Sequence, residues 1–388
     1  MTTVACIACG STRTQTLVDL PNIPVVCNDL HDSAASAQAA ATGTMRIEYC
    51  SACHHFFNSA FDDSVISYSE NYETSLHHSA VFQEYAAGLV DKLVNGYAVT
   101  RSTLLEVGCG RGEFLNSLCN AGANTAFGFD TSYDGGATIG EQHPGLNIRS
   151  TYFDAELELP AIDLVVSQQV LEHVEDPRAF LDLLVSHPSV AGHDALLYLE
   201  VPNGLYTFAN DGIWDLIYEH VSYFSSDSLL RLVESCGCEV IEHGESFGGQ
   251  YLYLVARVSG TDHSAYEAQR SYAFVDGFAD RFAAKTERWE RELSSDLAAT
   301  GRTFVWGAGS KGITFCNIMD PEGKLGGLVD RHPNKVGKFV PSTGAPILSP
   351  SMLPAAQPDR IIVMNPLYIE EIRVDLASAG LQPEILEA

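Results

Sequence analysis

The chain has 388 residues, of which 46% are hydrophobic and 19% charged, as expected for a globular protein with two large units and a smaller one. Its formal net charge of −28 disfavours nucleic acid and anionic lipid as partners, because both are polyanions. No apolar run reaches the roughly 18 residues of a membrane span, and the first residues lack the pattern of a secretory signal. We therefore expect a cytoplasmic monomer or homodimer, whose ten cysteines are thiols or metal ligands rather than disulfides.

Two Cys-x-x-Cys pairs mark an N-terminal unit, which we assign to residues 1–64. The paired residues are Cys6, Cys9, Cys50 and Cys53. A unit this small usually needs disulfides or a bound metal ion for stability, and four thiolates form the tetrahedral ligand set that zinc prefers. We predict a structural zinc site without an open position for substrate; unrelated thiols are the alternative. The small residues at 33–41 predict a surface loop or a short helix.

Residues 65–258 alternate helical and strand patterns, which predicts an α/β unit with a doubly wound parallel sheet. The expected strands are 103–107, 126–129, 162–167, 195–200 and 251–258. The expected helices are 81–95, 112–121, 177–186 and 226–236.

Residues 259–388 predict connector helices followed by a second, Rossmann-like α/β unit. The polar stretch 264–300 is expected to form a long helix or a helix pair. The second unit begins at Arg302 with strands at 304–306, 328–330 and 361–364, and a helix at 368–378 closes it.

The first strand of the larger unit runs into a glycine-rich turn. Its glycines, Gly108, Gly110 and Gly112, let the backbone approach a ligand and free the amides at a helix start. Glu106 precedes them and Asp130 ends the next strand. Glu106 would repel a pyrophosphate, so the pattern favours a cationic, unphosphorylated ligand. S-adenosylmethionine fits, with its sulfonium and amino acid near Glu106 and its ribose on Asp130.

Two further residues complete the expected cofactor site. Asp154 lies in an aromatic stretch that could flank the adenine, and Gln168 follows the next core strand, ahead of Leu-Glu-His-Val at 171–174. With these motifs the chain resembles the class I S-adenosylmethionine-dependent methyltransferases; a nicotinamide-binding fold is the alternative. We expect His173 to support the site structurally or to line the methionine end rather than to act in catalysis.

The segment 213–225 follows a strand that ends near Asn203, at the carboxyl edge where doubly wound sheets bind ligands. Carbon methylation needs a base to remove a proton beside a carbonyl, and a histidine such as His220 suits this role. The adjacent Glu219 could orient that histidine or hold a substrate hydroxyl. Tyr223 and Phe224 are expected in the core.

The order of the three units resembles the sugar C-methyltransferases, which combine an N-terminal zinc-binding unit, a central methyltransferase and a C-terminal Rossmann-like unit. In that family a Tyr-His-Glu-His-x-Ser-Tyr-Phe-Ser segment supplies the base for methylation beside the keto group of a nucleotide-linked keto-deoxysugar. By position, the resemblance implies His220 as base and Glu219 as its neighbour. Tyr218, the third catalytic candidate, replaces the family's first histidine, and Ile217 replaces its tyrosine. The presumed substrate face therefore loses a phenol and an imidazole.

The second glycine-rich turn, at 307–312, departs from the family's Gly-Ala-x-Ala-Lys-Gly pattern. Lys311 at a helix N-terminus suits a diphosphate, and Asp330 could take a ribose hydroxyl. A Rossmann unit retained only for packing is the alternative. Upstream, Tyr72 and His78 are expected to face the substrate, with surface placement the alternative.

Together these motifs predict an S-adenosylmethionine-dependent C-methyltransferase acting on a nucleotide-linked keto-sugar or a related phosphorylated metabolite. One alternative is an O- or N-methyltransferase of another small molecule, which needs no enolisation. The other is a scaffold that binds S-adenosylmethionine without turnover.

Overall fold

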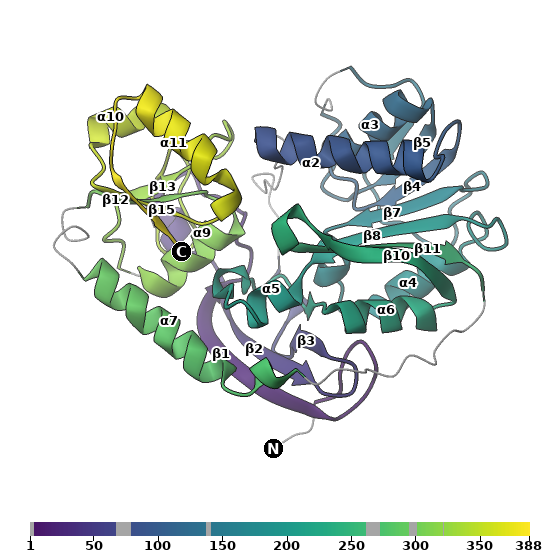
Figure 1. The fold of residues 1–388 in the computed structure, drawn as a ribbon, viewed down its shortest axis with the longest axis horizontal. Coiled ribbons are helices and arrows are strands. Elements are labelled where there is room, and N and C mark those ends of the chain that lie inside the picture. The colour runs from purple at the N-terminus through teal and green to yellow at the C-terminus, as the bar shows by residue number, and fades with distance from the viewer. Residues whose placement is uncertain (1–3, 67–78, 137–140, 261–271, 295–300, 321) are drawn as a thin grey trace.

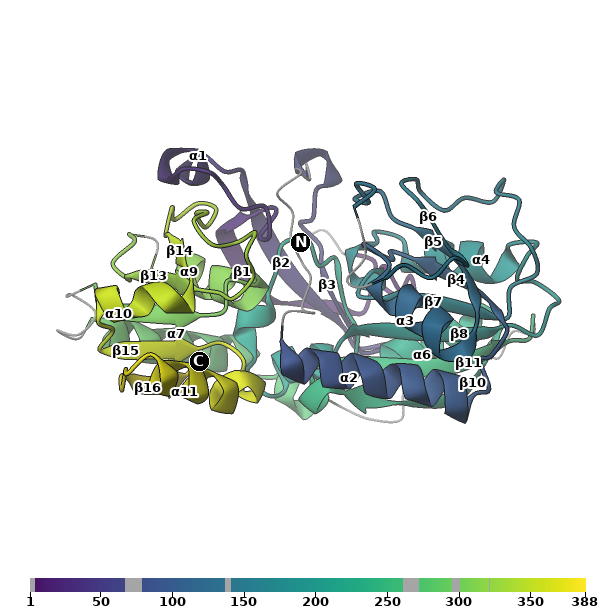
Figure 2. The same cartoon turned by 90° about the horizontal axis from the view of Figure 1, so that it is seen from above.

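A computed structural model describes residues 4–66, 79–136, 141–260, 272–294, 301–320 and 322–388 of the chain. In it the chain forms three sheets, of four, seven and five strands. The N-terminal strands lie between the two α/β units, one on each side of them (Figures 1 and 2).

The four-stranded antiparallel sheet has the order β1-β2-β3-β9. Its strands are β1 (Thr14–Pro24), β2 (Thr42–Cys50), β3 (His55–Asn58) and β9 (Ser222–Tyr223). The short helix α1 (Ala34–Gln38) follows β1, which agrees with the expectation for the small-residue stretch. Strand β9 comes from the middle of the chain, where Phe56 pairs with Tyr223 and Phe57 with Ser222. The N-terminal sheet is therefore completed by two residues of the same segment that carries His220.

The seven-stranded sheet has the order β10-β11-β8-β7-β4-β5-β6. Its strands are β4 (Thr103–Val107), β5 (Thr125–Phe129), β6 (Leu146–Arg149), β7 (Leu164–Gln168), β8 (Leu196–Pro202), β10 (Cys238–Ser246) and β11 (Tyr251–Val258). Only β11 runs antiparallel to its neighbours β8 and β10, so the sheet is mixed. The inner strands are buried along most of their length, as in sheets covered by helices on both faces. This is the class I methyltransferase α/β fold that the sequence predicts.

Helices cover both faces of this sheet (Figure 1). Those on one face are α2 (Ala80–Asp91) and α3 (Glu113–Gly122), and those on the other are α4 (Pro177–Ser186) and α6 (Ser226–Ser235). Asp176 caps α4, with its side chain accepting a hydrogen bond from the Ala179 amide, and Pro177 follows at the first helical position, where proline is well tolerated. Ser225 and Ser228 form a capping box at the start of α6.

The C-terminal sheet is wholly parallel, in the order β14-β13-β12-β15-β16. Its strands are β12 (Thr303–Trp306), β13 (Gly327–Val329), β14 (Ile347–Leu348), β15 (Arg360–Val363) and β16 (Glu384–Glu387). Its helices are α9 (Ser310–Met319), α10 (Leu353–Ala356) and α11 (Ile369–Ser378), and α7 (Phe278–Leu293) precedes it. Further short helices are α5 (Gly204–Phe208), η1 (Asp63–Val65), η2 (Lys92–Gly96), η3 (Leu171–His173), η4 (Ile213–Asp215), η5 (Phe247–Gly249), η6 (Ala273–Val275), η7 (Pro350–Met352) and η8 (Pro366–Tyr368).

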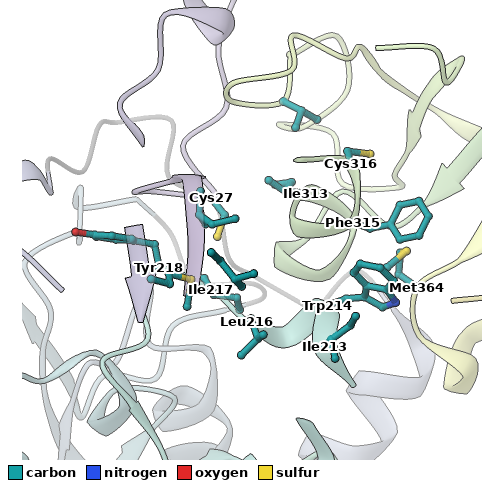
Figure 3. Packing of buried hydrophobic residues seen from close by; sticks show 14 of the residues in the cluster. Cys27, Ile213, Trp214, Leu216, Ile217, Tyr218, Ile313, Phe315, Cys316 and Met364 are labelled. Atoms are coloured by element: carbon teal, nitrogen blue, oxygen red, sulfur yellow. The ribbon is translucent and has the colours of Figure 1, made fainter. Parts of the chain in front are cut away.

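One large apolar core joins residues of all three units. Trp214, in η4, packs edge-on against Phe315 of α9, with ring centroids 4.8 Å apart. Trp289 of α7 contacts the same ring at 5.1 Å. Figure 3 shows the side chains of Ile213, Trp214, Leu216 and Ile217 packed between the loop at Cys27 and helix α9. The segment that leads to His220 is therefore held by the N-terminal and C-terminal units together.

Within the described residues, no helix combines the length and the apolar character needed to cross a membrane.

Candidate active site

The first glycine-rich turn joins β4 to α3 at the carboxyl edge of the seven-stranded sheet. Gly108, Gly110 and Gly112 have φ angles of +80°, +54° and +78°, in a region that glycine adopts readily. A Cβ at Gly108 would lie 2.1 Å from Val170 Cγ2, whereas a Cβ at Gly110 would meet nothing within 4 Å. The turn is thus closely packed at Gly108 and open at Gly110, where a ligand can approach the backbone.

Asp130, which follows β5, ties this turn to the next strand. Its Oδ2 accepts a hydrogen bond from the Gly110 amide at 2.7 Å, and its Oδ1 accepts from the Ser132 amide at 2.8 Å and the Ser132 hydroxyl at 2.6 Å. A carboxylate oxygen accepts about two hydrogen bonds, and within the described part of the chain Oδ2 accepts only this one, which leaves a position beside the open end of the turn. The expected contact with ribose hydroxyls stays a prediction.

Glu106, in β4, is buried with 3% of its surface exposed. Its Oε2 has no hydrogen-bond partner among the described residues. Burial, together with the charges of Asp130 and Glu113, raises the pKa of Glu106 well above its usual range. A buried carboxylate without a cation is unfavourable, so this position fits a ligand that carries positive charge. The sulfonium and ammonium groups of S-adenosylmethionine meet that requirement.

The other two residues expected at the cofactor lie nearby in the fold but differ in exposure. Gln168 is half-buried at the end of β7. Asp154 is exposed, and its Oδ1 accepts a hydrogen bond from the Glu156 amide at 2.8 Å. Next to Asp154, the Tyr152 side chain is 81% exposed, whereas Phe153 is buried against Phe129. Their roles at an adenine remain predictions.

His173 and His220 meet at the carboxyl edge of the same sheet. Their rings lie edge to face, with centroids 4.9 Å apart. His173 Nδ1 donates a hydrogen bond to the Glu219 carbonyl oxygen at 3.1 Å. His220 is 9% exposed, and its Nδ1 has no hydrogen-bond partner in the described part of the chain. Burial lowers the pKa of His173 to about 4, and burial with the neighbouring His173 lowers the pKa of His220 well below its usual range.

The side chains of Glu219 and Tyr218 are engaged with the N-terminal unit. Glu219 Oε2 accepts a hydrogen bond from the Cys27 amide at 2.9 Å and another from the Cys27 thiol at 3.4 Å. The Tyr218 hydroxyl accepts a hydrogen bond from the Asp62 amide at 3.1 Å, and its ring lies 5.7 Å from that of Phe61. Both residues therefore anchor the His220 segment, and their predicted catalytic roles are untested.

Tyr223 and Phe224 are buried, as the sequence predicts. The Tyr223 hydroxyl accepts a hydrogen bond from the Ile217 amide at 2.9 Å and donates one to the Ile217 carbonyl at 3.0 Å. The tyrosine thereby closes the loop that carries Glu219 and His220.

Lys311 lies where the two α/β units meet. Its ammonium is 3.1 Å from Asp215 Oδ2, donates to Gln250 Oε1 at 2.6 Å and lies 4.9 Å from the centre of the Tyr206 ring. Burial raises the pKa of Asp215, although Lys311 opposes that shift. Sequence reasoning missed Asp215 and Gln250 as partners of Lys311, although both lie in stretches with recognisable patterns. The predicted contact of Lys311 with a diphosphate remains untested.

Asp330 holds the second glycine-rich turn as Asp130 holds the first. Its Oδ2 accepts a hydrogen bond from the Ala308 amide at 2.8 Å, and its Oδ1 accepts from the His332 amide at 2.8 Å. A Cβ at Gly312 would lie 1.9 Å from the Gly307 carbonyl oxygen, so helix α9 packs against the turn only because residue 312 is glycine. Asp330 as a ligand of ribose stays a prediction.

A buried carboxylate that sequence reasoning missed is Glu200, in β8. It accepts hydrogen bonds from the Tyr85 hydroxyl, from the Tyr198 hydroxyl at 3.0 Å and from the Gln169 amide group at 3.2 Å. Burial raises the pKa of Glu200, and these donors oppose the shift. The network links α2, through Tyr85, to the edge of the sheet where His173 lies.

The four expected zinc ligands converge. The sulfur atoms of Cys6, Cys9, Cys50 and Cys53 all lie within 4.8 Å of one another. Cys6 Sγ is 3.6 Å from Cys53 Sγ, and Cys9 Sγ is 3.7 Å from Cys50 Sγ. A tetrahedral zinc with Zn–S bonds of about 2.3 Å places its sulfur ligands about 3.8 Å apart. The cluster therefore fits structural zinc, whose presence remains a prediction. Tyr72 and His78 lie outside the described residues.

Comparisons with known proteins agree with this architecture. Residues 78–243 match a family model described as "Methyltransferase domain", and residues 260–380 match one described as "C-methyltransferase C-terminal domain". The C-methyltransferase NovU of Streptomyces niveus is 28% identical over 225 residues, which cover 54% of this chain and 52% of that relative. The chain thus spans about half the length of the curated relative it matches.

Two solved structures are similar at a TM-score of 0.37. One is the magnesium protoporphyrin IX methyltransferase ChlM of Synechocystis PCC 6803 with bound SAH, at 20% identity, covering 48% of this chain and 89% of that one. The other is an S-adenosylmethionine-dependent methyltransferase of Listeria monocytogenes described as putative, at 13% identity, covering 46% of this chain and 99% of that one.

The fold and the two family models agree with one another. The chain has the class I methyltransferase α/β fold, residues 78–243 are similar to methyltransferase domains, and residues 260–380 are similar to the C-terminal domain of C-methyltransferases.

Proposed function

We propose that this chain is an S-adenosylmethionine-dependent C-methyltransferase that methylates the carbon beside a ketone. The proposed substrate is a nucleotide-linked keto-sugar or a related phosphorylated metabolite. The observation that carries the proposal is His220, a buried histidine at the carboxyl edge of the sheet whose Nδ1 has no hydrogen-bond partner among the described residues.

The proposed cofactor site consists of Glu106, Asp130 and the open backbone at Gly110. When bound, S-adenosylmethionine supplies an electrophilic methyl group. The buried Glu106 would hold the positive end of the cofactor, and the free acceptor position on Asp130 would orient a ribose hydroxyl. Helix α3 begins directly after this turn, so its first amides point toward the same space.

The proposed chemistry of the chain is proton removal. A neutral imidazole has one nitrogen with a free lone pair, and in this mechanism the His220 ring accepts the proton from the carbon beside the ketone. The electrons of that C–H bond form an enolate, whose carbon would accept the methyl group as the S–CH3 bond breaks and S-adenosylhomocysteine leaves. His173 fixes the position of the base, because its ring packs edge to face on His220 and is itself tied to the Glu219 carbonyl.

Specificity for a phosphorylated substrate would come from the C-terminal unit. Lys311 forms an ion pair with Asp215, which belongs to the segment that leads to His220. Lys311 also donates a hydrogen bond to Gln250, so the second glycine-rich turn faces the methyltransferase domain. A diphosphate could replace Asp215 as the partner of Lys311. This arrangement supports a substrate that reaches from the second glycine-rich turn to His220.

The test is solvent deuterium exchange at the substrate carbon in the absence of methyl donor. Purified protein is incubated in D2O with a panel of nucleoside-diphosphate-linked keto-deoxysugars, and exchange is read by mass spectrometry. We expect exchange that His220→Gln abolishes and that the exposed control His243→Gln leaves unchanged. If a substrate is methylated without deuterium exchange at carbon, and His220→Gln retains this methylation, the result would instead support O- or N-methylation. Tight cofactor binding without product from any compound would support the scaffold.

A further inference from the structure

We propose that Glu172, His173 and His220 form a second metal site, separate from the cysteine cluster, that binds a divalent transition metal such as Zn²⁺ or Co²⁺. The site itself rests on geometry alone, and its effect on catalysis rests on the proposed function. One ligand atom from each of these residues lies within 4.8 Å of the others. Two imidazoles and one carboxylate are a common ligand set for such ions and leave positions open for water.

His173 is already oriented as a metal ligand. Its Nδ1 donates to the Glu219 carbonyl oxygen at 3.1 Å, so the proton sits on Nδ1 and the lone pair is on Nε2. Histidines that bind metals usually make this kind of bond through their other nitrogen, because it fixes the tautomer and the ring orientation. Nε2 then faces Glu172, whose Oε1 is 4.0 Å away.

One oxygen of the Glu172 carboxylate lacks, among the described residues, the partner that a buried polar atom normally has. Only 1% of the residue is exposed, and its Oε2 has no hydrogen-bond partner in the described part of the chain. Among the same residues, the only positively chargeable group within ion-pair distance is His173, at 4.0 Å. A carboxylate this buried is stabilised by a cation, and a metal ion between Glu172 and His173 would supply one.

His220 provides the third ligand. Only 9% of its surface is exposed, and its Nδ1 is without a hydrogen-bond partner among the described residues. The edge-to-face packing with His173 brings the two rings to 4.9 Å between centroids. Metal–ligand bonds of about 2.1 Å place ligand atoms roughly 3.0 to 3.4 Å apart, so the gap of 4.0 Å between Glu172 and His173 would close by less than about 1 Å.

Metal binding and catalysis would then exclude each other. The His220 ring has a single lone pair when neutral, and a metal on that nitrogen leaves none for the substrate proton. A metal ion at this site is therefore an inhibitor that competes with the keto substrate, whereas zinc at the cysteine cluster is structural.

The experiment is an optical titration of the full-length zinc-loaded protein with Co²⁺. With the cysteine cluster already filled, we expect a saturable visible band from nitrogen and oxygen ligands, without the near-ultraviolet charge-transfer band of thiolate ligands. Glu172→Gln and His173→Gln should each weaken Co²⁺ binding at least tenfold, whereas the exposed control His243→Gln should not. Circular dichroism confirms that each variant is folded, and Glu172→Gln keeps the shape of the side chain.

Two outcomes would overturn the site: no saturable band in the parent protein, or a band of unchanged affinity in both folded variants. The titration needs no turnover, so its failure is distinct from failure of the proposed function. A Co²⁺ band together with no proton exchange on any keto-sugar would refute the proposed function and leave the metal site standing.

Discussion

The packing of Val170 against Gly108 predicts how much stability a side chain at position 108 would cost. Gly108→Ala places a Cβ 2.1 Å from Val170 Cγ2 on a backbone with φ of +80°. The left-handed conformation costs an alanine about 1 to 2 kcal/mol, and forcing the side chains apart costs about 1 to 3 kcal/mol more. We therefore expect the free energy of unfolding to fall by about 2 to 5 kcal/mol, measured by urea denaturation with the slope checked for two-state behaviour.

Gly110→Ala is the matched control, because its φ of +54° is also left-handed but its Cβ would meet nothing within 4 Å. It should lose only about 1 to 2 kcal/mol, while its Cβ occupies the space proposed for the cofactor and weakens S-adenosylmethionine binding. Adding Val170→Ala to Gly108→Ala should recover part of the loss beyond additivity. Equal destabilisation by the two glycine substitutions, without recovery by Val170→Ala, would refute this account of the turn.

Three further predictions concern charge and metal. Because burial and the acidic neighbours Asp130 and Glu113 raise the pKa of Glu106, cationic S-adenosylmethionine should displace a proton on binding, and its affinity should rise with pH until that raised pKa is passed. Calorimetry in buffers of different ionisation enthalpy should detect this proton, and Glu106→Gln should abolish it; equal release in the variant would exclude Glu106 as its source. Lys311→Met leaves Asp215 without this ion-pair partner and should lower the free energy of unfolding by about 1 to 3 kcal/mol. Adding Asp215→Asn should restore most of the lost stability, as measured by thermal unfolding. Metal analysis of reduced protein should find about one tightly held zinc per chain, which Cys6→Ser should release; retention of zinc by that variant would show that it binds elsewhere.

The parts of the fold that local patterns determine were predictable from the sequence. Strand β11 and helix α4 were predicted with their observed bounds. Buried apolar runs bounded by turn residues also located the central parallel strands of the two α/β units, because such strands are covered on both faces. The convergence of the four cysteines followed from ligand chemistry.

The parts that depend on distant pairing were not predictable in this way. Strand β9 has two residues and no periodicity of its own, so nothing local shows that it completes the N-terminal sheet. The Glu219 carboxylate was expected beside its neighbour His220, yet it accepts from Cys27, 192 positions away in the chain. Likewise the partners of Lys311 lie in other elements, and only the packed core brings them together.

The pairing of β3 with β9 has a consequence for synthesis on the ribosome. The Ser225 hydroxyl donates to the His54 carbonyl across 171 positions, and the edge of β3 has no partner until that part of the chain has emerged. At about 5 to 20 residues per second, this delay lasts roughly 10 to 30 s. Throughout that time a short apolar edge strand, which can pair with other chains, is uncovered. Early capture of metal by the four cysteines, all of which precede β3 in the chain, would hold the nascent sheet in register until its last strand arrives.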